Sequence, residues 1–130
     1  MKLQLLLIAL LSALLFTACQ KEEVNCRDNT LAVYKGQDND GNEGSIELKE
    51  GTGEKGVIAI MTIEDANGTP FSFNMTGELN ENCSTLTLPS QNIGIGTLSG
   101  IFAITNDGNK MDGTVTNSSG DSFALNLTRQ

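Results

Sequence analysis

Apolar and polar residues alternate along most of the chain beyond residue 30, and this alternation restricts the fold more than any other feature. In residues 70–79, the sequence PFSFNMTGEL places two phenylalanines and a methionine on one side, and serine, asparagine and threonine on the other. A period of two is typical of a half-buried β-strand, whereas an amphipathic helix repeats its apolar positions about every 3.6 residues. The sequence therefore predicts an all-β fold.

Eight segments with strand-like patterns are separated by short connectors. The connectors contain Asn67-Gly68, Asp107-Gly108 and Ser119-Gly120, pairs that tolerate the positive φ of tight turns. Short connectors make successive strands antiparallel neighbours, and a sheet of seven or eight such strands must close into a barrel or fold over as a sandwich to protect its edges. The many short turns favour an up-and-down meander that closes into a small barrel, with the last strand pairing with the first. The predicted strands are residues 31–35, 45–49, 56–64, 70–79, 84–88, 93–105, 110–116 and 121–129.

Large side chains at inward positions predict a filled barrel. The 112 residues beyond residue 18 are few for a barrel that also encloses a drug-sized cavity. We therefore expect any ligand at one mouth, near Tyr34, or on the outer surface. Residues 57–63 are apolar on both faces, and an exposed second face there would mark a partner surface. The inward positions that lead to the filled-core expectation are Phe71, Phe73, Phe102, Phe123, Leu125 and Leu127.

The first 18 residues have the pattern of a secretory signal peptide. Met1 and Lys2 give a positive start, residues 3–16 are almost wholly apolar, and the small residues Thr17 and Ala18 follow. This run is shorter than the roughly 20 residues of a spanning helix, so cleavage is favoured over a permanent transmembrane anchor.

The end of this segment, Phe-Thr-Ala-Cys at residues 16–19, resembles the lipobox of bacterial lipoproteins, with Phe16 where leucine is usual. The resemblance implies that Cys19 is acylated and that residues 19–30 form a polar tether. The next residues resemble the export signal of surface lipoproteins of Bacteroidota, formed here by Lys21, Glu22 and Glu23 after Gln20. This second resemblance implies an outer-membrane protein that faces the medium. A charged linker that only keeps the tether solvated would have the same sequence.

Two further cysteines remain after lipidation of Cys19. Cys26 and Cys83 are 57 positions apart, and an isolated pair in an exported chain usually forms a disulfide. Two separate buried thiols are the alternative.

Composition excludes several classes of function. The chain has a formal net charge of −8 and no histidine. Nucleic-acid binding needs clustered lysine and arginine, and histidine-based catalysis or zinc binding needs imidazole. Asp38, Asp40 and Glu43 share one loop, but Lys49 stands where a calcium loop would need its twelfth ligand. We therefore expect no metal, no cofactor and no enzymatic activity.

The mature chain as a whole resembles small surface lipoproteins of Bacteroidota with lipocalin-like barrels. The shared features are the acylated cysteine, the acidic tether, Cys26 before the first strand and Tyr34-Lys35-Gly36 on it, although the tryptophan of true lipocalins is missing. Our leading hypothesis is a non-enzymatic binding or accessory role for such a barrel, with a small apolar or amphipathic ligand and with the amphipathic Tyr34 as the candidate mouth residue. One alternative is a solid-core module that binds an envelope protein through its outer face. A carboxylate-based hydrolase is a third alternative.

Overall fold

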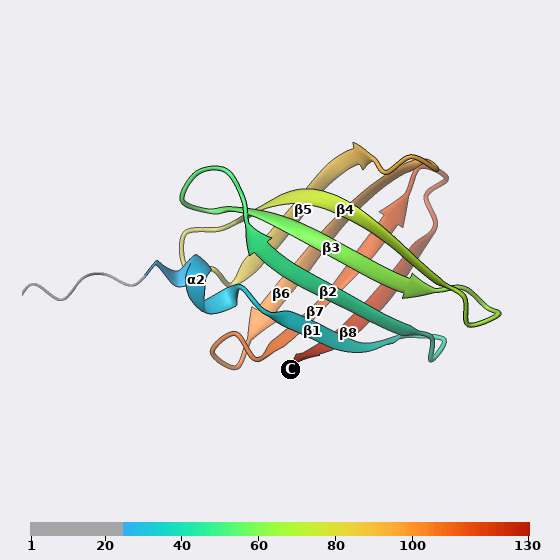
Figure 1. Cartoon of the computed structure of the whole chain (residues 1–130), viewed down its shortest axis with the longest axis horizontal. Helices are drawn as coiled ribbons and strands as arrows, with labels where there is room; N and C mark the ends of the chain where they lie inside the picture. Colours follow the sequence, from blue (N-terminus) through green and yellow to red (C-terminus); the bar gives the residue numbers. More distant parts are fainter. Residues whose placement is uncertain (1–24) are drawn as a thin grey trace, which may run out of the picture.

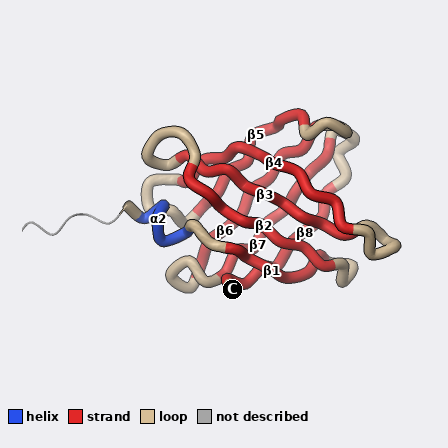
Figure 2. Tube along the Cα trace, in the orientation of Figure 1, coloured by secondary structure: helices blue, strands red, loops and turns tan. Residues whose placement is uncertain are grey.

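The computed structural model describes residues 25–130, which form one closed barrel of eight antiparallel strands in sequence order (Figures 1 and 2). The predicted all-β meander barrel is therefore confirmed. The elements are helix α2 (Cys26–Thr30) and strands β1 (Val33–Asp38), β2 (Glu43–Glu50), β3 (Gly56–Glu64), β4 (Pro70–Leu79), β5 (Thr85–Asn92), β6 (Thr97–Thr105), β7 (Lys110–Asn117) and β8 (Ser122–Arg129).

The first and last strands close the barrel, as the sequence predicted. Strand β1 lies between β2 and β8, with Tyr34 opposite Ile46 on one side and Arg129 on the other. The connections between strands alternate between the two ends of the barrel. We call the end beside α2 the helix end and the opposite end the open end. The helix end carries α2 and the β2–β3, β4–β5 and β6–β7 connections, and the open end carries the other four (Figure 1).

All eight predicted strands are present, but three bounds differ clearly: β1 covers residues 33–38 instead of 31–35, β5 continues to Asn92 instead of ending at residue 88, and β6 starts late. The predicted strand from residue 93 starts only at Thr97, because residues 93–96 form the turn between β5 and β6. Gly94 has a φ of 97°, and the Ile93 N–H donates to the carbonyl of Gly96 at 2.9 Å. Glycine reaches this left-handed conformation without steric cost, so the chain turns there.

The predicted tether of residues 19–30 is wrong from residue 26 onward, where the chain forms α2 and packs on the barrel. Asn25 caps the helix by accepting from the Arg27 N–H at 3.1 Å. The buried Arg27 guanidinium donates to the carbonyl of Gly53 and, at 2.8 Å, to the carboxylate of Glu50. These bonds fix α2 because a buried guanidinium must be paired. Residues 1–24, with the predicted signal peptide, lie outside the described residues.

Inward side chains fill the middle of the barrel. Side chains that lined a cavity wide enough for water would have accessible area, yet Tyr34, Met61 and Phe102 are 0% exposed. Phe102 lies opposite Gly113 in register, and its ring occupies the space where a Cβ of residue 113 would be. The predicted filled core is confirmed here. It consists of Tyr34, Ile46, Leu48, Val57, Ala59, Met61, Phe73, Met75, Leu79, Cys83, Leu86, Leu88, Leu98, Phe102, Ile104, Met111, Val115, Leu125 and Leu127.

No helix among residues 25–130 has the length and apolar character to cross a membrane.

Candidate functional site

Tyr34 lies at the helix end of the barrel but forms no accessible mouth. Its side chain is fully buried, and its hydroxyl is 3.0 Å from the carbonyl oxygen of Thr30 and 2.9 Å from that of Gly108. The expected ligand mouth near Tyr34 is therefore wrong, because α2 and the β6–β7 connection cover this residue. Burial raises the pKa of Tyr34 above 10.0, and the positive charge of Arg129 partly offsets this increase.

The same end holds the cysteine pair that the sequence predicted. Cys26 in α2 and Cys83 in the β4–β5 connection are joined as a disulfide, with Cα atoms 5.9 Å apart. The Lys55 ammonium lies 3.2 Å from the Cys26 sulfur and 3.1 Å from the carbonyl oxygen of Glu81. The disulfide and the lysine thus hold α2 against the β4–β5 connection.

The open end is where the apolar interior meets solvent. Phe71 and Phe123 are only half-buried, although both were expected in the core, and the exposed fractions of Phe73 and Leu98 are 6% and 8%. The rings of Phe71 and Phe73 are 5.5 Å apart and tilted by 38°. We call this set the apolar rim. Its members are Ile63, Phe71, Phe73, Ile93, Leu98 and Phe123.

The barrel wall is incomplete beside the apolar rim, between β4 and β5. These strands are in register only at Glu78 with Thr87 and at Leu79 with Leu86, and they diverge toward the open end (Figure 1). Pro89 comes two residues after Thr87 and has no N–H to continue the ladder. The register of β5 with β6 also shifts between Leu88 and Gln91.

We call the unpaired stretch between β4 and β5, from residues 77 and 88 to the open end, the seam. One side chain bridges it. The Gln91 amide accepts from the Thr76 N–H at 2.8 Å and donates to the Thr76 carbonyl at 2.8 Å. It thereby replaces one pair of backbone hydrogen bonds. A hollow of about 510 Å³ lies where β4 and β5 begin to pair, and the residues that line it include Thr76, Glu78, Asn80, Thr87 and Pro89. Sequence reasoning missed the seam, although a proline inside a strand pattern is a signal for an unpaired edge.

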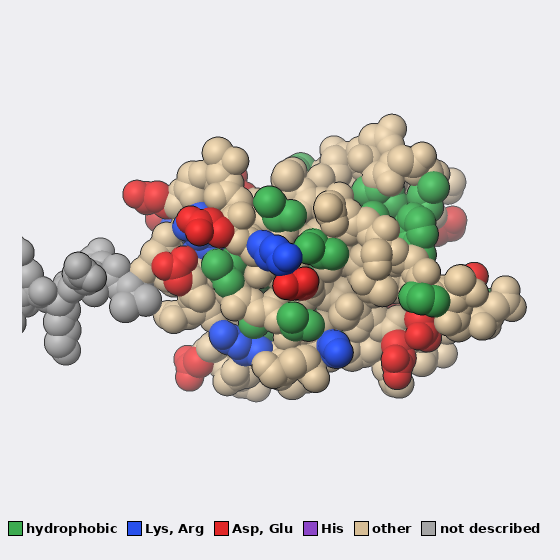
Figure 3. Space-filling model, viewed as in Figure 1, with side chains coloured by type: hydrophobic (Ala, Val, Ile, Leu, Met, Phe, Trp, Pro, Cys, Tyr) green, Lys and Arg blue, Asp and Glu red, His purple; other side chains and the backbone are tan. Residues whose placement is uncertain are grey.

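Charge is unevenly divided between the two ends. The four connections at the open end contain Asp40, Asp65 and Asp121 but neither lysine nor arginine, and Glu43 and Glu64 lie beside them. In Figure 3, the basic side chains on the visible face lie over the middle and the helix end, whereas apolar and acidic side chains adjoin at the open end. The surroundings of the apolar rim are therefore negative.

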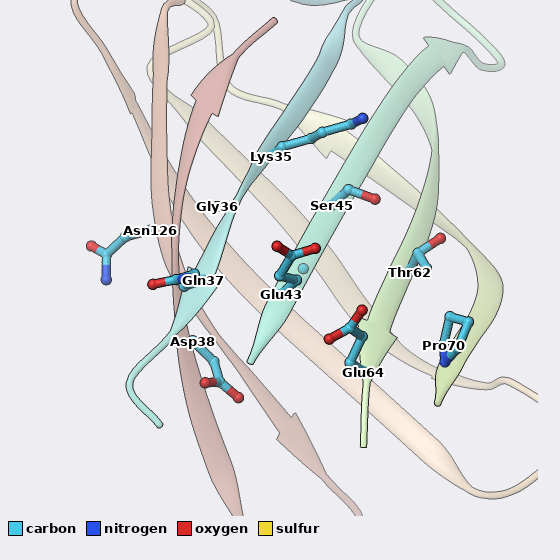
Figure 4. Close-up of a pocket in the computed structure, with 11 residues that line it drawn as sticks. Lys35, Gly36, Gln37, Asp38, Glu43, Ser45, Thr62, Glu64, Pro70 and Asn126 are labelled. Carbon is cyan, nitrogen blue, oxygen red and sulfur yellow. The ribbon is translucent and has the colours of Figure 1, made fainter. Parts of the chain in front are cut away.

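A polar groove of about 730 Å³ runs across the outside of β8, β1, β2 and β3 (Figure 4). Lys35, Ser45 and Thr62 line one part, and Glu43 and Glu64 line the part nearer the open end. None of its lining residues is aromatic, so it lacks the flat apolar face that commonly stacks on sugars.

The acidic loop after β1 uses its first carboxylate to hold its own turn. Asp38 accepts from the Asp40 N–H at 2.9 Å and from the Asn42 N–H at 2.8 Å. Slight desolvation raises the pKa of Asp38, but hydrogen bonds from Asn42, Asp40 and Gly41 outweigh it and hold that pKa below 3.8. Between Asn25 and Gln130 no three acidic, cysteine or histidine side chains are placed to share a metal ion.

Apolar side chains on the outer wall are scattered. Ile58 on β3 is 37% exposed, so the second face of residues 57–63 does reach solvent, and Ile101 on β6 is 61% exposed. These strands are three positions apart around the barrel, so the two side chains belong to separate places. Single exposed apolar residues are normal on protein surfaces.

The predicted lipidation and export residues Cys19, Lys21, Glu22 and Glu23 lie outside the described residues.

Comparison with known proteins identifies the fold. The chain matches no protein-family model and no curated protein. A redesigned β-barrel is similar over 85% of this chain and 99% of its own, with 13% identity and a TM-score of 0.64. A de novo designed fluorescence-activating β-barrel is similar over 83% and 100%, with 13% identity and a TM-score of 0.57. A redesigned β-barrel, mFAP1, bound to DFHBI is similar over 82% and 100%, with 11% identity and a TM-score of 0.61. At these identities the likeness establishes a small β-barrel and nothing about activity.

Proposed function

We propose that this chain is a lipid-anchored, non-enzymatic binding module of the bacterial outer membrane that takes an apolar or amphipathic ligand at its open end. The observation that carries the proposal is the apolar rim, four of whose six side chains are only half-buried, at one end of a barrel that is otherwise filled. A filled core provides stability, whereas apolar side chains left at a solvent boundary gain free energy when a ligand covers them.

The position of the predicted anchor supports this assignment. Cys19 precedes Asn25 by six residues, a span of at most about 20 Å, and Asn25 caps α2 at the helix end. Acylation of Cys19 would therefore hold the helix end toward the membrane. The open end, on the opposite side of the barrel, would face the medium (Figure 1).

The character of the rim supports binding over catalysis. All six rim side chains are hydrocarbon, so none of them can transfer a proton or attack a substrate. A similar small barrel, mFAP1, is bound to DFHBI, which is consistent with a ligand in a barrel of this shape.

The proposal is tested with N-phenyl-1-naphthylamine, an uncharged dye that fluoresces in apolar surroundings. The protein is residues 20–130, which retains every described residue and lacks the lipidation site. We expect saturable binding that Phe123→Ser weakens about tenfold, since burying an aromatic side chain contributes about 1.5–3 kcal/mol. The matched control is Ile101→Ser on the outer wall of β6, which should leave the affinity unchanged.

Two outcomes would contradict the proposal. One is no saturable binding by a protein that melts cooperatively. The other is equal weakening by Ile101→Ser and Phe123→Ser, which would place the dye on the surface in general.

A further inference from the structure

Strand β4 has a free edge at the open end, which follows from the direction of its backbone groups. The Leu79 N–H donates to the Lys55 carbonyl, on the side of β3, whereas both backbone groups of Thr76 face Gln91 of β5. Successive residues of an antiparallel strand point their N–H and C=O groups to opposite sides. The backbone N–H and C=O groups of Ser72 and Asn74 therefore also point toward β5. No β5 residue is in register with either of them.

The free edge of β4 has the backbone groups and the adjoining apolar side chains that an added strand would need. The N–H and C=O groups of Ser72 and Asn74 are a short template for backbone hydrogen bonds. Inward residues Phe71 and Phe73 of the same strand belong to the apolar rim, so a strand laid along β4 would place alternate side chains against it. On the β5 side, Pro89 lacks the N–H that would compete for the edge.

Acidic side chains near the two ends of the free edge indicate which charges the ends of an added strand should have. Glu64 lies opposite Pro70 in register, and Glu78 pairs with Thr87 where the seam closes, so one carboxylate flanks each end of the free stretch. The connection next to Glu64 adds Asp65. Basic residues at both ends of an incoming segment would therefore be attracted, and acidic ones repelled.

We propose that the free edge of β4 docks an extended peptide segment of a partner protein, with alternating apolar residues and a basic residue at each end. This inference rests on the proposed function, because the apolar side chains of the peptide would cover the apolar rim. It adds the class of ligand and the backbone hydrogen bonds that hold it.

The test uses a seven-residue probe, acetyl-Lys-Val-Thr-Val-Thr-Val-Lys-amide, labelled for fluorescence anisotropy and titrated with residues 20–130. We expect saturable binding at low salt. The same peptide with glutamate for lysine should bind at least about tenfold more weakly, since like charges replace opposite ones. An analogue N-methylated on every amide of the seven residues should also lose at least about tenfold, because it cannot donate to β4 from either edge.

Two substitutions at one position separate backbone pairing from side-chain contact. Asn74→Pro removes the free N–H that faces the seam and leaves the β3–β4 ladder intact, so the barrel should fold and the probe should bind at least about tenfold more weakly. Asn74→Ala keeps the N–H and should bind the probe like the wild-type chain. Glu64→Gln with Glu78→Gln should abolish the preference for the lysine peptide, whereas Glu81→Gln at the helix end should preserve it.

The outcomes distinguish this inference from the proposed function. Equal binding of the lysine and glutamate peptides, or of the N-methylated and parent peptides, would overturn peptide docking. If the naphthylamine dye still binds and Phe123→Ser still weakens it, the open end remains a ligand site of another kind. If Asn74→Pro does not fold, the N-methylated peptide on the wild-type chain gives the decision.

Discussion

The hydroxyl of Tyr34, at the start of β1, lies 2.9 Å from the carbonyl oxygen of Gly108, which is 74 residues further along the chain. The carbonyl of Thr30 is 3.0 Å from the same hydroxyl, so this one group links β1, α2 and the β6–β7 connection. A buried phenol stays neutral most easily when its proton has such an acceptor. The Tyr34 hydroxyl therefore joins the bonds of Arg27 and the Cys26–Cys83 disulfide in closing the helix end, whereas the six side chains of the apolar rim have no polar group that could close the open end.

Alkaline titration should reveal this burial directly. The chain has one tyrosine and no tryptophan, so phenolate absorbance reports on Tyr34 alone. The pKa of Tyr34 is raised in the folded state, so the unfolded chain releases this proton first as the pH rises above 10.0. The stabilisation by the neutral phenol is complete below pH 10.0 and is lost as the pH rises through the folded-state pKa.

Unfolding by urea at several pH values, with absorbance followed in parallel, measures this effect. Tyr34→Phe should cost about 1–2 kcal/mol at neutral pH, because it removes a donor from buried carbonyls, and its stability should fall less steeply above pH 10.0. Phenolate absorbance that develops at an unshifted pKa while the protein stays folded would show that Tyr34 is accessible.

Substitutions of phenylalanine should lower the free energy of unfolding more in the middle of the barrel than at its open end. Phe102→Ala should lower the free energy of unfolding by about 3–5 kcal/mol, since its ring is fully buried over Gly113. Phe71→Ala should cost only about 1 kcal/mol, because that side chain is half exposed. Urea unfolding of both variants decides the matter, and similar costs at the two positions would mean that the open end is packed as tightly as the middle.

The sequence predicts the barrel well because strand alternation and turn residues are local signals. Residues 56–64 and 70–79 form strands with the predicted bounds. Helix α2 escaped prediction because a five-residue helix has no periodicity to detect, and the bonds of Arg27 to Gly53 and Glu50 that hold it are long-range.

The binding features depend even more on tertiary structure. Tyr34 is amphipathic, which suits a barrel mouth, but α2 buries it, and sequence alone does not show which end a helix will cover. The bridge between Gln91 and Thr76 arises because β4 and β5 diverge, and a side-chain amide that replaces a ladder bond leaves no pattern in the sequence. Pro89 is the one local sign of the seam.

Acylation of Cys19 is predicted by its place after the apolar leader. Cells fed a fatty-acid probe should label the wild-type protein, and Cys19→Ser should abolish the label, because the thiol is the acylated group. Several acyl chains give stable membrane attachment, so the wild-type protein should also sediment with membranes. Undiminished label on the serine variant would refute lipidation at this residue.

Surface display is predicted to depend on Lys21, Glu22 and Glu23. Replacing all three with alanine should preserve acylation but make the protein inaccessible to protease added to whole cells. The matched control is Asp28→Ala, an exposed acid in α2 just beyond the signal, which should remain accessible. If the triple variant is cleaved as fast as the wild type, the charges serve only to solvate the tether.

The disulfide should contribute to stability mainly by restricting the unfolded chain. Cys26 and Cys83 close a loop with a sequence separation of 57, for which chain entropy gives about 4 kcal/mol. A Cys26→Ser, Cys83→Ser variant should lose up to this amount but still fold, because Arg27 and Tyr34 also hold the helix end through hydrogen bonds. Intact mass after thiol alkylation shows the bond directly: without reductant neither of these cysteines should be alkylated, and with reductant both should be. Two alkylated thiols before reduction would refute the bond, and Cys83→Ser would then cost only the packing of a small buried side chain.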